Sequence, residues 1–118
     1  MQTDRAILSF SQSEKAKAGI IWVSNAINII EGLHGSEKKG GEKIISVMIN
    51  MISQEIKLAG AVSGLPAWSE IEPHLDKAAA MIDSDMSHEA VIHLTNALSR
   101  ITSIGQQSMS ALKEKNLL

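Results

Sequence analysis

The sequence predicts an all-α protein that folds as an up-down-up-down four-helix bundle. Four segments, about 13–33, 42–63, 69–83 and 87–115, carry apolar residues three and four positions apart, which is the spacing of amphipathic helices. The connections between them are short, and short connections favour antiparallel neighbours. No stretch alternates apolar and polar residues for long enough to predict a strand. At 118 residues the chain has the length of a single domain.

The first helix is expected over about 13–33. Ser11 and Glu14 have the three-residue spacing of a capping box, in which each side chain bonds the other residue's backbone N–H. Gly32 predicts its end, because glycine readily adopts the left-handed conformation that terminates helices. The preceding residues 1–10 are expected to form an irregular N-terminal arm, so that the bundle domain itself covers 11–118.

The second helix is expected over about 42–63. It follows a polar, glycine-rich connection at 34–43, whose glycines disfavour helix propagation. Gly64 and Pro66 come directly after it and act as stop signals.

The third helix, about 69–83, begins at Ser69, and this start places Pro73 in the first turn, where a missing N–H costs little. The fourth helix, about 87–115, follows a cluster of serine and aspartate residues that suits an N-cap. Its apolar seam persists along its length but becomes small and polar after Ile104.

Composition excludes several classes of function. The net charge of −2 argues against binding to a phosphate backbone, and the three aromatic residues are too few to stack on single-stranded bases. The absence of cysteine excludes disulfides and thiolate zinc sites. No apolar run reaches the roughly 18 residues of a membrane helix, and the start lacks the pattern of a signal peptide. We therefore expect a cytoplasmic protein without a cofactor that binds neither nucleic acid nor membranes.

Glu55 interrupts the most apolar stretch of the chain, 44–62. On a helical wheel it falls inside the apolar half, and three interpretations are open. It can lie at the rim beside a lysine or arginine, with Ile56 turned inward. It can be buried against a polar partner in the core or against its symmetry mate in a dimer. It can also be a ligand or a catalytic carboxylate, which would require a pocket. The polar core partners considered are Ser24, Thr102 and Ser108.

A metal site is the alternative function that the sequence offers. Carboxylate-bridged bundles use Glu-x-x-His pairs, because residues three apart share one helix face. Glu31 and His34 have this spacing, and Glu55 and His74 are the further candidate ligands. Such a site needs two pairs, however, and only one is present. Glu31 as a rim charge and His34 as a residue capping the end of its helix explain the pair equally well.

The second helix carries more apolar surface than one bundle requires. Its apolar arc spans about 200°, whereas a bundle helix needs little more than about 100°. We therefore expect a non-enzymatic protein that acts through protein contacts, as a homodimer or other homo-oligomer or by binding a partner helix. The N-terminal arm folding over this surface is the other explanation. The residues expected at the interface are Trp22, Ile29, Leu33, Met48, Ile49 and Ile56.

Overall fold

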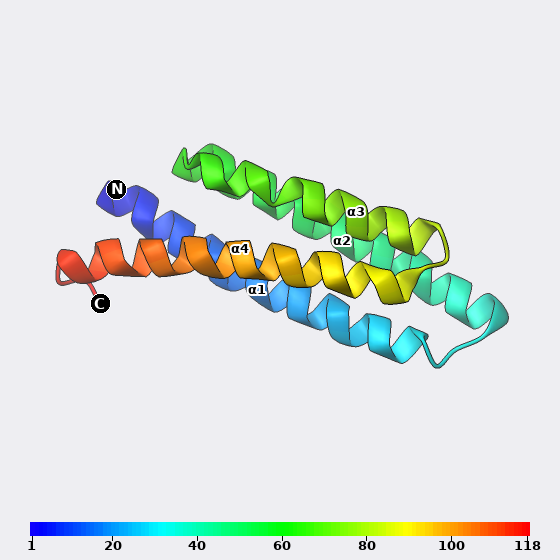
Figure 1. The fold of residues 1–118 in the computed structure, drawn as a ribbon. Helices are drawn as coiled ribbons and strands as arrows, with labels where there is room; N and C mark the ends of the chain where they lie inside the picture. Colours follow the sequence, from blue (N-terminus) through cyan, green and yellow to red (C-terminus); the bar gives the residue numbers. More distant parts are fainter.

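The computed structural model describes all 118 residues and shows a four-helix bundle without strands, as the sequence predicts. The elements in chain order are α1 (Thr3–Ile30), α2 (Gly35–Ser63), the 3₁₀ helix η1 (Pro66–Glu70), α3 (Glu72–Asp83) and α4 (Ser87–Glu114). Helices that follow one another pack together, and α4 closes the ring by packing against α1. Figure 1 shows α2 and α3 along one side of the molecule and the crossing pair α1 and α4 along the other.

The bundle is elongated, with principal extents of 54 × 21 × 18 Å. The first turns of α1 and the last turns of α4 lie at the same end and extend past η1 (Figure 1). Lys115 joins them, because its Nζ donates hydrogen bonds to the Met1 carbonyl oxygen at 3.3 Å and to Thr3 Oγ1 at 2.7 Å. The two ends of the chain are therefore adjacent.

The start of α1 at Thr3 shows that the irregular arm predicted for residues 1–10 is wrong. Ala6 and Ser9 are buried and continue the seam of the helix at the spacing of Ser13 and the residues beyond. Ser9 is also bonded, since the indole Nε1 of Trp68 donates to its Oγ at 3.3 Å. A seam built from serine and alanine carries little hydrophobic signal, so the apolar pattern alone placed the start too late.

The start of α2 at Gly35 also precedes its expected position, and the glycines of the connection lie inside the helix. Gly41 faces the end of α1, where an added Cβ would stand 2.6 Å from Cγ2 of Ile30. The helix therefore passes close to α1 because this residue has no side chain. Its end is as predicted, with Gly64 in the left-handed conformation at φ 69°.

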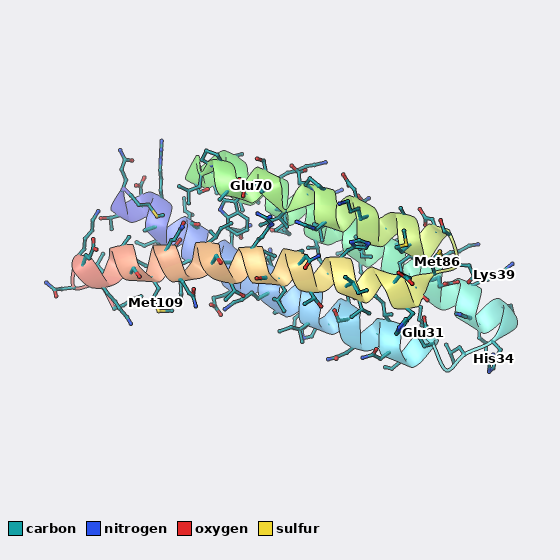
Figure 2. All side chains as sticks on the ribbon, in the orientation of Figure 1. Glu31, His34, Lys39, Glu70, Met86 and Met109 are labelled. Atoms are coloured by element: carbon teal, nitrogen blue, oxygen red, sulfur yellow. The ribbon has the colours of Figure 1, made fainter.

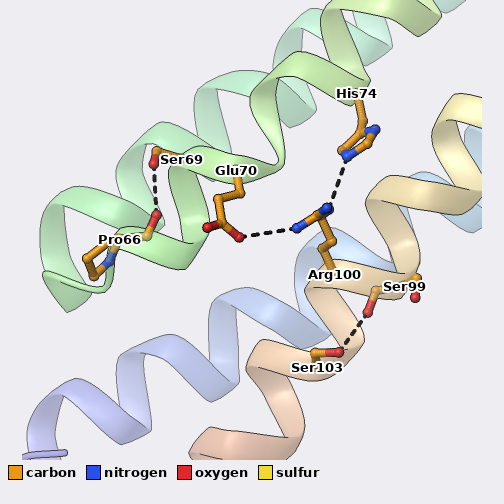
Figure 3. Close-up of polar contacts among 7 residues, drawn as sticks. All are labelled: Pro66, Ser69, Glu70, His74, Ser99, Arg100 and Ser103. Carbon is orange, nitrogen blue, oxygen red and sulfur yellow. Dashed lines mark hydrogen bonds and ion pairs between the residues drawn. The ribbon is translucent and has the colours of Figure 1, made fainter.

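The α3 helix begins at Glu72 rather than at Ser69. The hydroxyl of Ser69 donates instead to the Pro66 carbonyl oxygen at 2.8 Å and stabilises the preceding 3₁₀ turn (Figure 3). Pro73 still lies in the first turn of the helix, where no intrahelical donor is lost. The α4 helix begins at Ser87, as predicted.

The core is one continuous apolar cluster to which all four helices and η1 contribute. Beside this cluster, α1 and α4 pack closely where Gly105 faces Ser13. A Cβ added to Gly105 would lie 2.7 Å from Ser13 Oγ and 3.3 Å from Ser13 Cβ. The Ser13 hydroxyl donates to the Phe10 carbonyl oxygen at 2.7 Å, so it is satisfied within its own helix. The two helices are close because small residues face one another.

Gly105→Ala is expected to destabilise the bundle, whereas Gly40→Ala is expected to stabilise it. Both add one methyl group to a helix and remove the conformational freedom of glycine, worth about 0.5–1 kcal/mol. Gly40 is surrounded by open space, but Gly105 is not, and overpacking costs about 1–3 kcal/mol. Urea unfolding of the two variants measures the difference. Equal gains in both would show that α1 and α4 are not closely packed.

Candidate protein-binding face

Large apolar side chains are exposed along one side of α2. They recur three, four and seven positions apart and lie beside the buried seam of the same helix. The exposed residues are Ile44, Val47, Met51, Leu58 and Val62. Because α2 has a fully formed core side as well, these residues are surplus to the packing of the bundle.

A matching stripe runs along α1. Leu8, Trp22 and Ile29 are exposed and, with Lys15, are spaced seven residues apart, which places them on one side of the helix. Trp22 is 67% exposed and lines the same groove as Met51, so the two stripes face the same direction. We call the combined surface the α1–α2 face. It consists of Leu8, Lys15, Trp22, Ile29, Ile44, Val47, Met48, Met51, Glu55, Leu58 and Val62.

Three contacts fix the antiparallel register of α1 and α2. Gly41 lies against Ile30 at one end, Gly19 lies against Ile52 near the middle, and Gly64 lies against Arg5 at the other end. Ile29 and Ile44 are therefore at one end of the face, and Leu8 and Val62 are at the opposite end. The only two charged members, Lys15 and Glu55, lie between these apolar ends.

A groove of about 380 Å³ lies between α1 and α2 at the centre of the face. Its walls include the side chains of Trp22, Met48 and Met51, and Gly19 opens it by having no side chain. Lys15 and Glu55 are also among its lining residues. The groove is thus apolar over most of its surface and carries one pair of opposite charges.

Glu55 lies at the rim of the bundle beside a lysine, which is the first of the three interpretations of this residue. Its Oε1 lies 3.1 Å from Lys15 Nζ, and Gln12 Nε2 donates to its Oε2 at 3.2 Å. Its side chain is 33% exposed, while Ile56 takes the inward position. The hydrogen bond from Gln12, and then that from Lys15, lower the pKa of Glu55 below its usual 4.5, against a smaller effect of burial. None of the core partners considered for a buried carboxylate contacts it.

The predicted interface residues divide into two groups. Trp22 and Ile29 are exposed, and Leu33 and Met48 are half-buried. Ile49 and Ile56 are only 2% and 1% exposed, because the seam of α2 is rotated so that they point into the chain's own core. Their assignment to an interface is wrong.

The exposed side of α2 is formed instead by Ile44, Val47 and Leu58. The width of the apolar arc signalled that such residues exist, but it did not show which side of the arc faces the core. Residues 1–10 do not cover this surface, since Thr3 onward continues the straight course of α1.

The four candidate metal ligands are not brought together. Glu31 accepts a hydrogen bond from the Ser87 hydroxyl, whereas His34 is exposed and precedes α2 rather than capping α1. Figure 2 shows these two residues at the α1–α2 connection. Glu55 is bonded to Gln12 and Lys15, and His74 lies on α3. No three histidine or carboxylate side chains are grouped closely enough to hold a metal ion.

A second polar cluster joins η1 and α3 to α4 (Figure 3). Arg100 Nε donates to His74 Nε2 at 3.1 Å, and its Nη1 lies 3.2 Å from Glu70 Oε2. Because a guanidinium only donates, His74 must be neutral, with its proton on the buried Nδ1, which has no partner. Desolvation, followed by the charges of Arg100, Lys77 and His93, lowers the pKa of His74 below 6.5. The cluster is a structural link that ties η1 and α3 to α4.

Acidification through the range just below pH 6.5 is expected to weaken the bundle through His74. The folded state binds the proton less readily than the unfolded chain, so the stabilisation is complete above 6.5 and is lost as the pH falls towards the lower folded pKa. His74→Gln keeps an acceptor for Arg100 but does not titrate in this range. Urea unfolding of both proteins, one pH unit above and below 6.5, should show a smaller loss in the variant. Identical losses of stability in the two proteins would show that His74 does not cause the acid sensitivity.

Glu55→Gln is expected to cost less than about 1 kcal/mol of stability at neutral pH, because exposed ion pairs contribute little. The variant should also lose part of the acid sensitivity. The lowered pKa of Glu55 gives stabilisation that is present above 4.5 and disappears as the pH falls below it. Thermal unfolding from neutral pH to below 4 measures both effects. A loss of several kcal/mol would instead identify Glu55 as a core residue.

No helix of the bundle combines the length and the apolar character needed to cross a membrane. No protein-family model matches the chain, and no curated protein and no solved structure matches it either. The surfaces of the bundle itself are therefore the basis for an argument about function.

Proposed function

We propose that this protein is a non-enzymatic helical bundle that acts in the cytoplasm through protein contacts made by its α1–α2 face. The observation that carries the proposal is the pair of exposed apolar stripes on two adjacent helices. Eight large side chains of the face are between 39% and 69% exposed. At roughly 150 Å² for each such side chain in the open, they present about 700 Å² of apolar surface.

This surface is larger than a monomer normally exposes. Contiguous apolar patches on soluble monomers reach about 300–600 Å², and larger ones are typical of interaction sites. At about 25 cal/mol per Å², leaving such a face in water forgoes many kcal/mol of hydrophobic stabilisation. An occupant of the face would gain this free energy, less the cost of association.

The shape and chemistry of the face suit a helical or helix-paired partner. Two antiparallel helices with an apolar groove between them are the usual receptor for an amphipathic helix. Met48 and Met51 line the groove, and methionine side chains adapt readily to the shape of a partner. Lys15 and Glu55 neutralise one another, and an ion pair within an apolar face is suited to fixing the register in which a partner packs against it. The occupant is either another copy of the chain or a helix of a different protein.

Thiol protection in cells tests the proposal without assuming what the occupant is. The chain has no cysteine, so a single introduced cysteine is a unique probe. Met51→Cys should react slowly with a maleimide in the cells that produce the protein, and quickly after purification and dilution to nanomolar concentration. The reason is that a partner covers the face at cellular concentration and dissociates on dilution.

Ile92→Cys is the matched control, because Ile92 is 60% exposed on α4 and lies outside the face. Its thiol should react quickly in cells and after purification alike. Equal reactivity of the two thiols in cells would show that the α1–α2 face is uncovered there, and the proposal would then be wrong.

A further inference from the structure

We infer that the occupant of the α1–α2 face is a second copy of the chain, related by a two-fold axis that lies in the interface and runs along the groove between α1 and α2. This inference rests on the proposed function, because it names the partner at the same face. Its evidence is different, however: it comes from the positions of charged and apolar residues relative to the centre of the face, and not from the size of the face.

The charges at the centre are self-complementary. Lys15 on α1 and Glu55 on α2 lie at the same height, since their side chains are 3.1 Å apart across the helix pair. A two-fold axis that lies in the interface, parallel to α1 and α2 and above the groove between them, places each helix over the other helix of the partner at the same height. Each Lys15 would then face the partner subunit's Glu55, and two ion pairs would become a ring of four alternating charges. A single salt bridge in an apolar face is well placed for this symmetry.

The apolar residues around the centre obey the same symmetry. Leu8 and Trp22 lie seven residues on either side of Lys15, and Met48 and Val62 lie seven residues on either side of Glu55. At 1.5 Å per residue, all four are about 10 Å from the centre. Trp22 and Met48 share one end, because both line the groove.

The two-fold rotation exchanges the two helices but keeps each end of the face over the same end of the partner. It brings Trp22 against the partner subunit's Met48 and Leu8 against the partner subunit's Val62. Apolar residues therefore meet apolar residues, and charges meet opposite charges. A foreign helix requires no such matching of apolar and charged residues at equal heights on α1 and α2, whereas this isologous contact does.

The area also fits a dimer. The exposed apolar part of the face, about 700 Å², is close to the roughly 800 Å² that each partner buries in a standard specific interface. The polar side chains at its centre supply the remainder. A single amphipathic helix would cover the groove but leave the outer parts of both stripes in water.

Complementary charge variants test the arrangement by sedimentation velocity. Lys15→Glu leaves two carboxylates at the centre of the face, and Glu55→Lys leaves two ammonium groups. Each variant alone should self-associate about tenfold or more weakly than the wild type, because like charges meet across the axis. An equimolar mixture should associate as well as the wild type, because the two variants complement one another only between copies.

Lys57→Glu and Glu72→Lys are the matched controls. They make the same charge changes in an ion pair that joins α2 to the start of α3, outside the face. Both should associate as the wild type does, alone and in mixture. Circular dichroism confirms that each variant is folded before its association is compared.

Tryptophan emission gives a readout on the unmodified protein. Trp68 is fully buried, so its emission stays constant, whereas the exposed Trp22 should shift to shorter wavelength as the concentration rises from nanomolar to about 100 µM. Constant emission over this range, or a wild type that remains monomeric, would overturn the second copy as the occupant. Self-association that the mixed variants fail to restore would overturn the two-fold arrangement. In both cases the proposed function stands if Met51→Cys is protected in cells.

Discussion

The close approach of α1 and α4 at Ser13 and Gly105 is the constraint on which the rest of the structure depends. Because small residues face one another there, the two helices pack closely. The α2 helix packs against α1, α3 packs against α4, and the contact between α2 and α3 closes the ring. The arrangement uses one side of every helix. It leaves the outer sides of α1 and α2 without a neighbouring helix, and these sides carry the exposed apolar stripes.

Serine residues make this close packing possible without leaving polar groups unsatisfied. The hydroxyls of Ser13 and Ser108 donate to carbonyl oxygens of their own helices, and Ser9 accepts a hydrogen bond from Trp68. A buried hydroxyl that is bonded in this way costs little, and its small size lets the backbones approach. The small serine side chains also leave room for Trp68, which is fully buried where α1 meets η1.

The sequence predicted the number and order of the four α-helices because their apolar spacing is regular over many turns, but it did not predict the short 3₁₀ helix η1. It placed the start of α1 ten residues late, because a seam of Ala6, Ser9 and Ser13 has almost no hydrophobic contrast. It also misjudged which part of the broad apolar arc of α2 faces inward. Met48 and Ile49 are neighbours in the sequence and both are apolar. Hydrophobicity alone therefore does not show which of the two points into the core. The partners of Glu55 come from another helix, at positions that no local pattern relates to it.

The separation of core and face on α1 and α2 has a consequence for how such a protein can change over evolutionary time. Positions such as Ile45 and Ile52 are enclosed, and substitutions there affect folding. Positions such as Ile44 and Met51 stand in solvent on the same helix, so the isolated chain folds with little regard to what they are. Mutations can therefore accumulate at the face while the bundle stays intact. If the face binds a partner as proposed, the choice of partner can change without a change of fold.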